Sequence, residues 1–161
     1  GAAIGAPAAS LVSKQINYDG TRGADGSYSH SVDAQANAFS LEWGIQQTAG
    51  KQSITVATNN ASIDNGAATA FGAASYVHLI SFTGTDIFIG YDHSTDNAVG
   101  DPFAAIEAGA LEAAFTAVGK QRLDTTSTAT IKRYTRLYAS GTFSQATFVV
   151  NLVRYEIGGH P

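Results

Sequence analysis

The chain has 161 residues, which is enough for one domain with a hydrophobic core, or for one domain and an appended segment. Charged residues make up 14% of the sequence, against about 25% in a typical soluble domain, and the formal net charge is −4. An acidic chain lacks the basic surface that nucleic-acid binding requires, and the absence of cysteine excludes disulfides, thiolate metal sites and cysteine nucleophiles. No stretch approaches the roughly 18 consecutive apolar residues of a membrane-spanning helix.

The N-terminal part of the chain is predicted to contain a β-hairpin. A strand is indicated over residues 11–18, and the turn-rich sequence DGTRGADGS follows it at 19–27. In the returning strand Tyr28, His30 and Val32 alternate with polar residues, and this period of two predicts a half-buried strand.

Residues 38–47 continue the alternation. Phe39, Leu41 and Trp43 share one face of the predicted strand, so Trp43 is expected to pack in the core with the other two. The alternative is that Trp43 and the seven tyrosines of the chain form a sugar-stacking platform, as in a carbohydrate-binding module.

Turn signals divide the middle of the chain into further strands. Gly84 is predicted to form the turn of a hairpin, and Asn65-Gly66 a second tight turn. The strands that these signals separate are expected at 53–58, 75–82 and 86–92, with loops at 59–66 and 93–102.

The C-terminal third is also predicted to be β-structure. Residues 103–118 favour two short strands with a turn near 108–110 over a helix, because Gly109 interrupts the helix-favouring residues and no clean apolar stripe forms. Three more strands are predicted at 122–127, 129–140 and 146–157, with a turn around Gly141 between the last two.

Many short strands separated by turns predict an all-β fold: an antiparallel β-sandwich, Ig-like or jelly-roll-like, with an N-terminal β-rich arm or partial barrel. The predicted organisation is an N-terminal arm or hairpin segment over residues 1–51, a β-sandwich domain over 52–157, and a C-terminal tail over 158–161.

One loop brings several possible metal ligands close together in sequence. Its oxygen-bearing side chains suit a calcium or other divalent cation, but their spacing does not match an EF-hand. The favoured interpretation is that these side chains cap their own turns. The residues concerned are Asp92, His93, Asp96 and Asp101.

Other candidate groups favour structural roles. The cluster Lys132, Arg133 and Arg136 is interpreted as a solvated or interface face, and His30 and His78 as packed or hydrogen-bonded histidines. The acidic residues suit solvent faces and not a catalytic pair; they are Glu42, Glu107, Glu112 and Glu156. No nucleophile elbow or phosphate-binding loop occurs, so we predict no enzyme activity, no cofactor and no catalytic, cofactor-binding or metal-binding residue.

Several segments resemble a known family. The sequence KQINYDGTRGADGSYSHSVDAQANAFSLEWG (14–44), followed by QQTAGK (46–51), resembles part of the structural proteins of siphophages of actinobacteria and related hosts. Four later segments follow the order of that family's C-terminal β-sandwich module. They are DNGAATAFGAASYVHLISFTG (64–84), YDHSTDN (91–97), FTAVGKQRL (115–123) and IKRYTRLYASGTFSQATFVVNLVRY (131–155).

The resemblance covers about 140 residues and implies a structural role in a bacteriophage virion. It implies a tail-tube or major tail protein, with a capsid decoration protein as the alternative, and partners that are further copies of the chain, in a ring or trimer, and other virion proteins. The chain departs from the family in lacking a Trp after HSTDN, which puts the packing near Asp101 to Phe103 in doubt. Family members also extend further at the N-terminus, so residues 1–50 are either the last strands of a tube barrel or an arm that reaches a neighbour. Residues 1–18 and the terminal GGHP are expected to contact neighbouring subunits.

Overall fold

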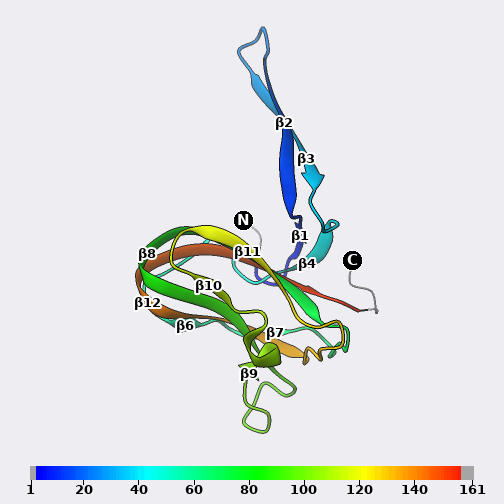
Figure 1. Cartoon of the computed structure of the whole chain (residues 1–161), viewed down its shortest axis with the longest axis vertical. Helices are drawn as coiled ribbons and strands as arrows, with labels where there is room; N and C mark the ends of the chain where they lie inside the picture. The colour runs from blue at the N-terminus through cyan, green and yellow to red at the C-terminus, as the bar shows by residue number, and fades with distance from the viewer. Residues whose placement is uncertain (1–2, 157–161) are drawn as a thin grey trace.

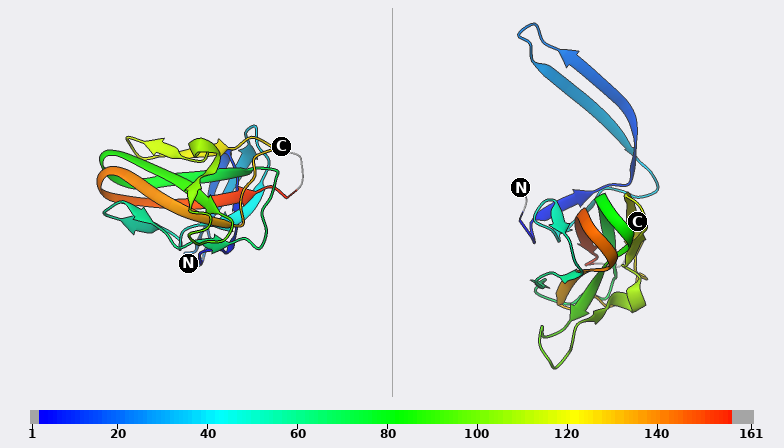
Figure 2. Two further views of the ribbon diagram at one scale, coloured as in Figure 1. Left: turned by 90° about the horizontal axis from the view of Figure 1, so that it is seen from below. Right: turned by 90° about the vertical axis from the view of Figure 1, so that its left-hand side faces the viewer.

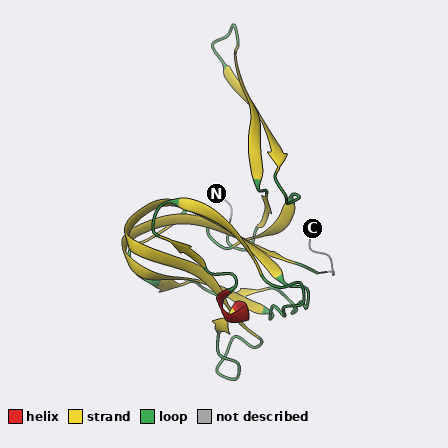
Figure 3. Cartoon of the chain, in the orientation of Figure 1, coloured by secondary structure: helices red, strands yellow, loops and turns green. Residues whose placement is uncertain are grey.

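The computed structural model describes residues 3–156 and is nearly all β, as predicted (Figures 1 and 3). The strands are β1 (Pro7–Ser10), β2 (Ser13–Arg22), β3 (Tyr28–Ala36), β4 (Glu42–Gln46), β5 (Gln52–Ile54), β6 (Thr58–Asn59), β7 (Ile63–Asp64), β8 (Ala73–Ser94), β9 (Ala104–Ala105), β10 (Ala113–Phe115), β11 (Gly119–Asp124) and β12 (Tyr134–Arg154). Within this range no helix is long and apolar enough to cross a membrane.

Two long strands, β8 and β12, organise the body of the molecule. They pair antiparallel along almost their whole length, from Ala73 opposite Arg154 to Ser94 opposite Tyr134. Both strands bend near their middle, where the pairing register shifts around Phe143. Each strand therefore contributes one half to each of two layers, which Figure 2 shows stacked on one another.

The bends correct two predictions. Gly84 and Gly141 were expected to form turns between strands, but each lies inside a continuous strand. A Cβ on Gly84 would stand 2.5 Å from the Cα of Phe143, and one on Gly141 would stand 2.7 Å from the carbonyl oxygen of Asp86. These glycines are needed because the two backbones approach closely where they bend, which is a use of glycine that sequence alone does not distinguish from a turn.

The hydrophobic core lies between the two layers. One layer joins β1, β4, β5 and β11 to the N-terminal half of β8 and the C-terminal half of β12. The other layer joins β6, β7, β9 and β10 to the remaining halves. Inward residues of both layers form one buried cluster, which includes Val77, Leu79, Phe148 and Val150 from the first layer and Ile87, Ile89 and Leu137 from the second.

Residues 103–118 form two short strands, as predicted, and not an α-helix. Between β9 and β10 lies a single 3-10 turn, Ile106–Gly109, in which Glu107 and Ala108 have positive φ angles. The strand predicted at 53–58 is instead two shorter strands, β5 and β6, and the loop predicted at 59–66 contains β7.

The N-terminal segment divides between the body and a projection. Strands β1 and β4 belong to the first layer of the sandwich, whereas β2 and β3 form a separate two-stranded sheet that extends away from it (Figures 1 and 2). The domain boundary predicted at residue 51 falls in the turn between β4 and β5. The predicted tail, 158–161, lies outside the described residues.

Candidate functional site

The projecting hairpin, residues 13–36, is named the arm below. It was predicted from its turn signals, and the turn lies where the backbone N–H of Gly23 donates to the carbonyl of Ser27 over 2.8 Å. Asp25 stabilises the turn by accepting a hydrogen bond from the backbone N–H of Ser27 at 2.9 Å. The hydrogen bond from the Ser27 side chain, and after it this backbone bond, hold the pKa of Asp25 below its ordinary value.

The prediction that the returning strand is half-buried was wrong. Every residue of β2 and β3 is exposed, because the described residues place no third layer on either face of the arm. Large apolar side chains are included: Tyr18, Tyr28 and Val32 are 58%, 60% and 56% exposed. Single exposed apolar residues are common on proteins, but several on one small ribbon indicate a contact surface.

The arm has two chemically different faces. On the aromatic face Tyr18 pairs across the strands with Val32, and the His30 ring lies 4.9 Å from Tyr18 and 4.4 Å from Tyr28. His30 therefore contacts two aromatic rings, although it is exposed to solvent. The opposite face is polar and contains Asn17, Asp19, Thr21, Ser29, Ser31 and Asp33.

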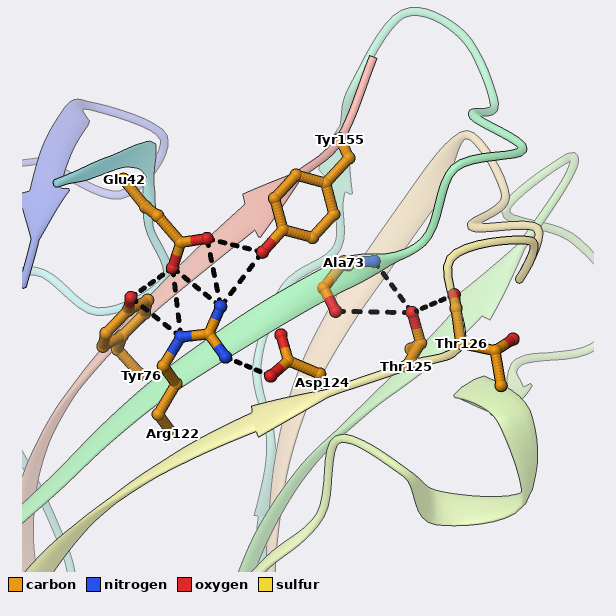
Figure 4. A network of polar contacts seen from close by, with 8 residues as sticks. All are labelled: Glu42, Ala73, Tyr76, Arg122, Asp124, Thr125, Thr126 and Tyr155. Carbon is orange, nitrogen blue, oxygen red and sulfur yellow. Dashed lines mark hydrogen bonds and ion pairs between the residues drawn. The ribbon is translucent and has the colours of Figure 1, made fainter. Parts of the chain in front are cut away.

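A buried ion pair joins β4 to β11 in the first layer of the sandwich, next to the base of the arm (Figure 4). Glu42, at the start of β4, and Arg122, on β11, have side chains only 4% and 7% exposed. Arg122 Nη2 lies 3.0 Å from both carboxylate oxygens of Glu42, and its Nε lies 3.1 Å from one of them. The remaining guanidinium nitrogen, Nη1, pairs with Asp124.

Two tyrosines complete this network. Tyr155 donates a hydrogen bond to Glu42 at 2.6 Å, and Tyr76 donates to the other carboxylate oxygen. Burial alone would raise the pKa of Glu42, but hydrogen bonds from Tyr155, Tyr76 and Arg122 outweigh it and hold that pKa below its ordinary value. Burial and the bond to Glu42 raise the pKa of Tyr76 to about 12.

An aromatic contact ties the arm to this network. The ring of Phe39, in the segment between β3 and β4, stacks on the Arg122 guanidinium with 3.8 Å between the ring centre and the guanidinium carbon. The backbone N–H of Asn37 also donates to the carbonyl of Val12 at 2.8 Å, which closes the base of the hairpin. Phe39 thus connects the base of the arm to the body of the molecule.

This region corrects the predictions for Glu42 and Trp43. Glu42 was assigned to a solvent face but is buried, whereas Trp43 was assigned to the core but is 67% exposed. The predicted strand over 38–47 begins only at Glu42, so Phe39 and Leu41 lie in a loop and do not share a strand face with Trp43. Glu42 points to one side of β4, where Tyr76, Arg122 and Tyr155 bind it, while Trp43, the next residue of the strand, points to the opposite side.

Trp43 borders a shallow groove of about 450 Å³. Polar groups of Asp64, Asn65 and Arg154 lie around it, and the Arg154 guanidinium is bonded to the carbonyl of Ala67 at 2.6 Å. An exposed indole beside several hydrogen-bonding groups is a suitable arrangement for stacking a flat or ring-shaped ligand.

The acidic residues of the 93–102 loop bind groups within the protein. Asp101 forms an ion pair with Lys132 at 2.8 Å and accepts a bond from the backbone N–H of Thr95 at 2.7 Å. These bonds lower the pKa of Asp101 to about 2, the Lys132 bond having the larger effect. Asp96 caps its own turn through the N–H of Ala98 at 2.9 Å, which matches the favoured interpretation of this loop.

The remaining charged candidates also have structural partners. Asp92 binds Arg136, and Asp64 binds Arg133, each at 2.6 Å. His93 accepts a bond from the backbone N–H of Lys132, and burial, followed by the Lys132 charge, lowers the pKa of His93. The basic cluster therefore consists of cations that are already paired.

The other predicted positions are dispersed. Glu107 accepts bonds from Thr126, and Glu112 accepts one from Tyr138, while Glu156 is exposed. His78 is also exposed on the outer side of β8, which contradicts the prediction that it is packed. Across residues 3–156 no group of three or more potential ligands is placed to hold a metal ion. The Glu42 network was missed because its members come from strands 34 to 113 residues apart in sequence and no local pattern links them.

The features that distinguish this chain are therefore the two-faced arm, the buried ion pair next to its base, and the exposed Trp43. No protein-family model matches the chain, and no curated protein or solved structure is detectably similar to it.

Proposed function

We propose that this protein is a non-enzymatic structural subunit that acts by self-assembly in a bacteriophage virion. The observation that carries the proposal is the arm: a ribbon that projects from the sandwich with exposed aromatic side chains, and whose base is connected to the body through the contact of Phe39 with Arg122. The assignment to a virion rests on the sequence resemblance described above. Its first location is the tail tube, as a major tail protein, and its partners are further copies of the chain and other virion proteins, with no role for nucleic acid or membranes.

The edges of the sandwich support association. Strands β1 and β11 each pair on one side only within the described part of the chain, so their outer N–H and C=O groups are open to a neighbouring strand. The low charge content lowers the desolvation cost of covering such surfaces. Assembly needs no catalytic group, only complementary surfaces.

The test is the oligomeric state of the purified protein. We expect rings or tubes in negative-stain electron microscopy, and a sedimentation coefficient that rises with concentration. If the protein remains monomeric even at high concentration, the proposal is contradicted.

Capsid decoration is the alternative location within a virion. It predicts trimers that bind expanded capsids and increase their resistance to heat or chaotrope, with the arm contacting the adjacent subunit. If the protein forms rings in solution and does not bind capsids, the tail tube remains as its proposed location.

Carbohydrate binding is a second candidate function, favoured by one observation. Trp43 is exposed beside a groove with polar groups, as a sugar-stacking residue would be. Because Trp43 is not part of the core, Trp43→Ala should fold normally. A glycan array that gives a hit in the parent chain and none in this variant would establish the function, and a silent array would remove it.

A further inference from the structure

The groove beside Trp43 lies between the two layers of the sandwich, at one end. Ile45 pairs in register with Leu152, a buried core residue, so both side chains are on the inner face of the first layer. Trp43, two positions before Ile45 on β4, is on the same face. The other side of the groove is formed by residues 63–65, in and just after β7 of the second layer. Trp43 therefore points inward but lies beyond the part of the core that the second layer covers, which explains its 67% exposure.

Arg154 connects the two layers at this groove. It lies two positions after Leu152 on β12 and shares its inward face. Its Nη2 donates to the carbonyl of Ala67 at 2.6 Å, and its Nη1 to the carbonyl of Asn65 at 3.5 Å. Its Nε forms no hydrogen bond with any described residue. A guanidinium has five N–H donors, so several of those on Arg154 have no acceptor among the described residues.

The groove contains both signs of charge. Arg154 is half-buried and forms no ion pair within residues 3–156. Burial lowers the pKa of Arg154, and the negative charge of Glu156, which also lines the groove, acts in the opposite direction. Glu156 is exposed and likewise has no ion pair in the described part of the chain, whereas Asp64 is already bonded to Arg133. The groove therefore presents a donor group, Arg154, and an acceptor group, Glu156.

These groups favour a neutral ligand that carries hydroxyl groups. An anion in the groove would be repelled by Glu156 and Asp64, and a cation would be repelled by Arg154. A hydroxyl group suits both kinds of partner, because it can accept a hydrogen bond from Arg154 and donate one to Glu156. Trp43 adds a large flat apolar surface, on which the C–H groups of a sugar ring can stack.

The size of the groove favours a short saccharide. Its volume of about 450 Å³ lies toward the lower end of the range of about 300–1,000 Å³ that small-molecule sites occupy. The groove is also bounded by both layers and does not run along the face of a sheet. A ring at the end of a saccharide can enter it, whereas a long chain would have to continue outside it.

We propose that the open end of the sandwich binds a neutral pyranose sugar, whose ring stacks on Trp43 and whose hydroxyl groups bond to Arg154 and Glu156. This inference rests on the second candidate function above, carbohydrate binding, and names the class of sugar and the residues that select it. It does not involve the arm, so it is independent of self-assembly.

Tryptophan fluorescence tests this directly, because Trp43 is the only tryptophan of the chain and its emission reports on this groove alone. The full-length protein is titrated with the methyl glycosides of glucose, galactose and mannose. The neutral glycoside that binds best is then compared with its uronic acid and its 2-amino counterpart, which differ from it in charge. We expect a saturable change with the neutral glycoside, and dissociation constants about tenfold higher or more for the two charged ones.

Two substitutions test the residues that select the sugar. Arg154→Gln removes the donor group and should raise the dissociation constant of the neutral glycoside about tenfold, and Glu156→Ala should raise it about threefold. Because Glu156 is exposed, its substitution should leave the fold intact even if Arg154→Gln does not. The control is Lys120→Gln, which removes an exposed cation that does not line this groove and should leave binding unchanged.

The outcomes separate this inference from carbohydrate binding itself. If a charged sugar binds as well as the neutral one, or if both substitutions leave binding unchanged, this inference is overturned and carbohydrate binding stands. The same holds if a glycan that binds on an array does not change the fluorescence of Trp43. If neither the array nor any glycoside gives a signal, carbohydrate binding and this inference are both overturned.

Discussion

The arm and the sandwich body use the same strand pattern with opposite outcomes. On β12 the alternating residues Phe148, Val150 and Leu152 are fully buried, whereas on β3 Tyr28 and Val32, at the same spacing, are more than half exposed. Alternation decides which side chains share a face of a strand. It does not decide whether another layer covers that face, and the difference between the two regions is the presence of that layer.

The largest expected effect is on the free energy of unfolding, which should fall for a substitution in the core of the body and hardly change for one on the arm. Phe148→Ala should lower the free energy of unfolding by about 3–5 kcal/mol, because it leaves a cavity between the layers. Tyr28→Ala on the arm, measured at a concentration where the chain is monomeric, should change it by less than about 0.5 kcal/mol. Urea denaturation of both variants checks this, and similar losses in the two would show that the arm belongs to the cooperative core.

The junction between the regions should respond to an intermediate degree. Glu42→Gln keeps the size of the side chain but removes the charge that Arg122 and two tyrosines bind, so we expect a loss of about 1.5–3 kcal/mol. The control is Asp64→Asn, which removes the carboxylate of an exposed pair with Arg133 and should cost clearly less. Equal losses would mean that burial does not strengthen the Glu42 network.

The same junction predicts an alkaline limit of stability. The folded state raises the pKa of Tyr76 from 10.0 to about 12, so it holds the phenol proton more tightly than the unfolded chain. This contribution is complete below pH 10 and is lost as the pH rises toward 12. Thermal unfolding between pH 8 and 12 should show the decline. Tyr76→Phe should make it shallower without removing it, because burial also raises the pKa values of Tyr91, Tyr138 and Tyr155.

On the acid side the sign is opposite. The pKa of Glu42 lies below its ordinary value of 4.5 and that of Asp101 falls to about 2, so both stabilise the folded state at higher pH. Their contribution is complete above about pH 4.5 and decreases as the pH falls toward 2. In Glu42→Gln the acid decline should be shallower than in the parent chain, and an unchanged slope would contradict the role of this carboxylate.

The smallest expected effect is from removing the arm altogether. Because Asn37 and Val12 are hydrogen-bonded to each other, a short Gly/Ser linker can replace residues 13–36 without moving β1 or β4. The monomer of this variant should unfold within about 0.5 kcal/mol of the parent, while its assembly should be lost. If the body fails to fold without the arm, its stability is not independent of the arm, contrary to this prediction.

Local signals in the sequence predicted more of the fold than of the site. The all-β class, the hairpin at 13–36 and the two short strands within 103–118 follow from turn residues and alternation over a few positions. The bends at Gly84 and Gly141 were mistaken for turns because glycine serves both close backbone approach and tight turns.

The site depends on contacts between distant residues. Nothing near Glu42 in sequence indicates that Arg122 and Tyr155 will lie beside it, so the residue was assigned to solvent. Trp43 was assigned to the core because Phe39 and Leu41 were placed on the same strand, although the strand begins after them. The first error concerns which distant residues cover Glu42, and the second concerns where β4 begins; both are set by tertiary packing.

The pairing of β8 with β12 also governs the order in which the molecule can fold. The arm joins residues close in sequence and can close in about 1–10 μs, but it has little to stabilise it at that stage. The body must bring residues 73–94 against residues 134–154, and such distant pairing is slow. Because both layers share these two strands, we expect the two layers to form together, and the contact between Phe39 and Arg122 to form only after β11 has paired with β8.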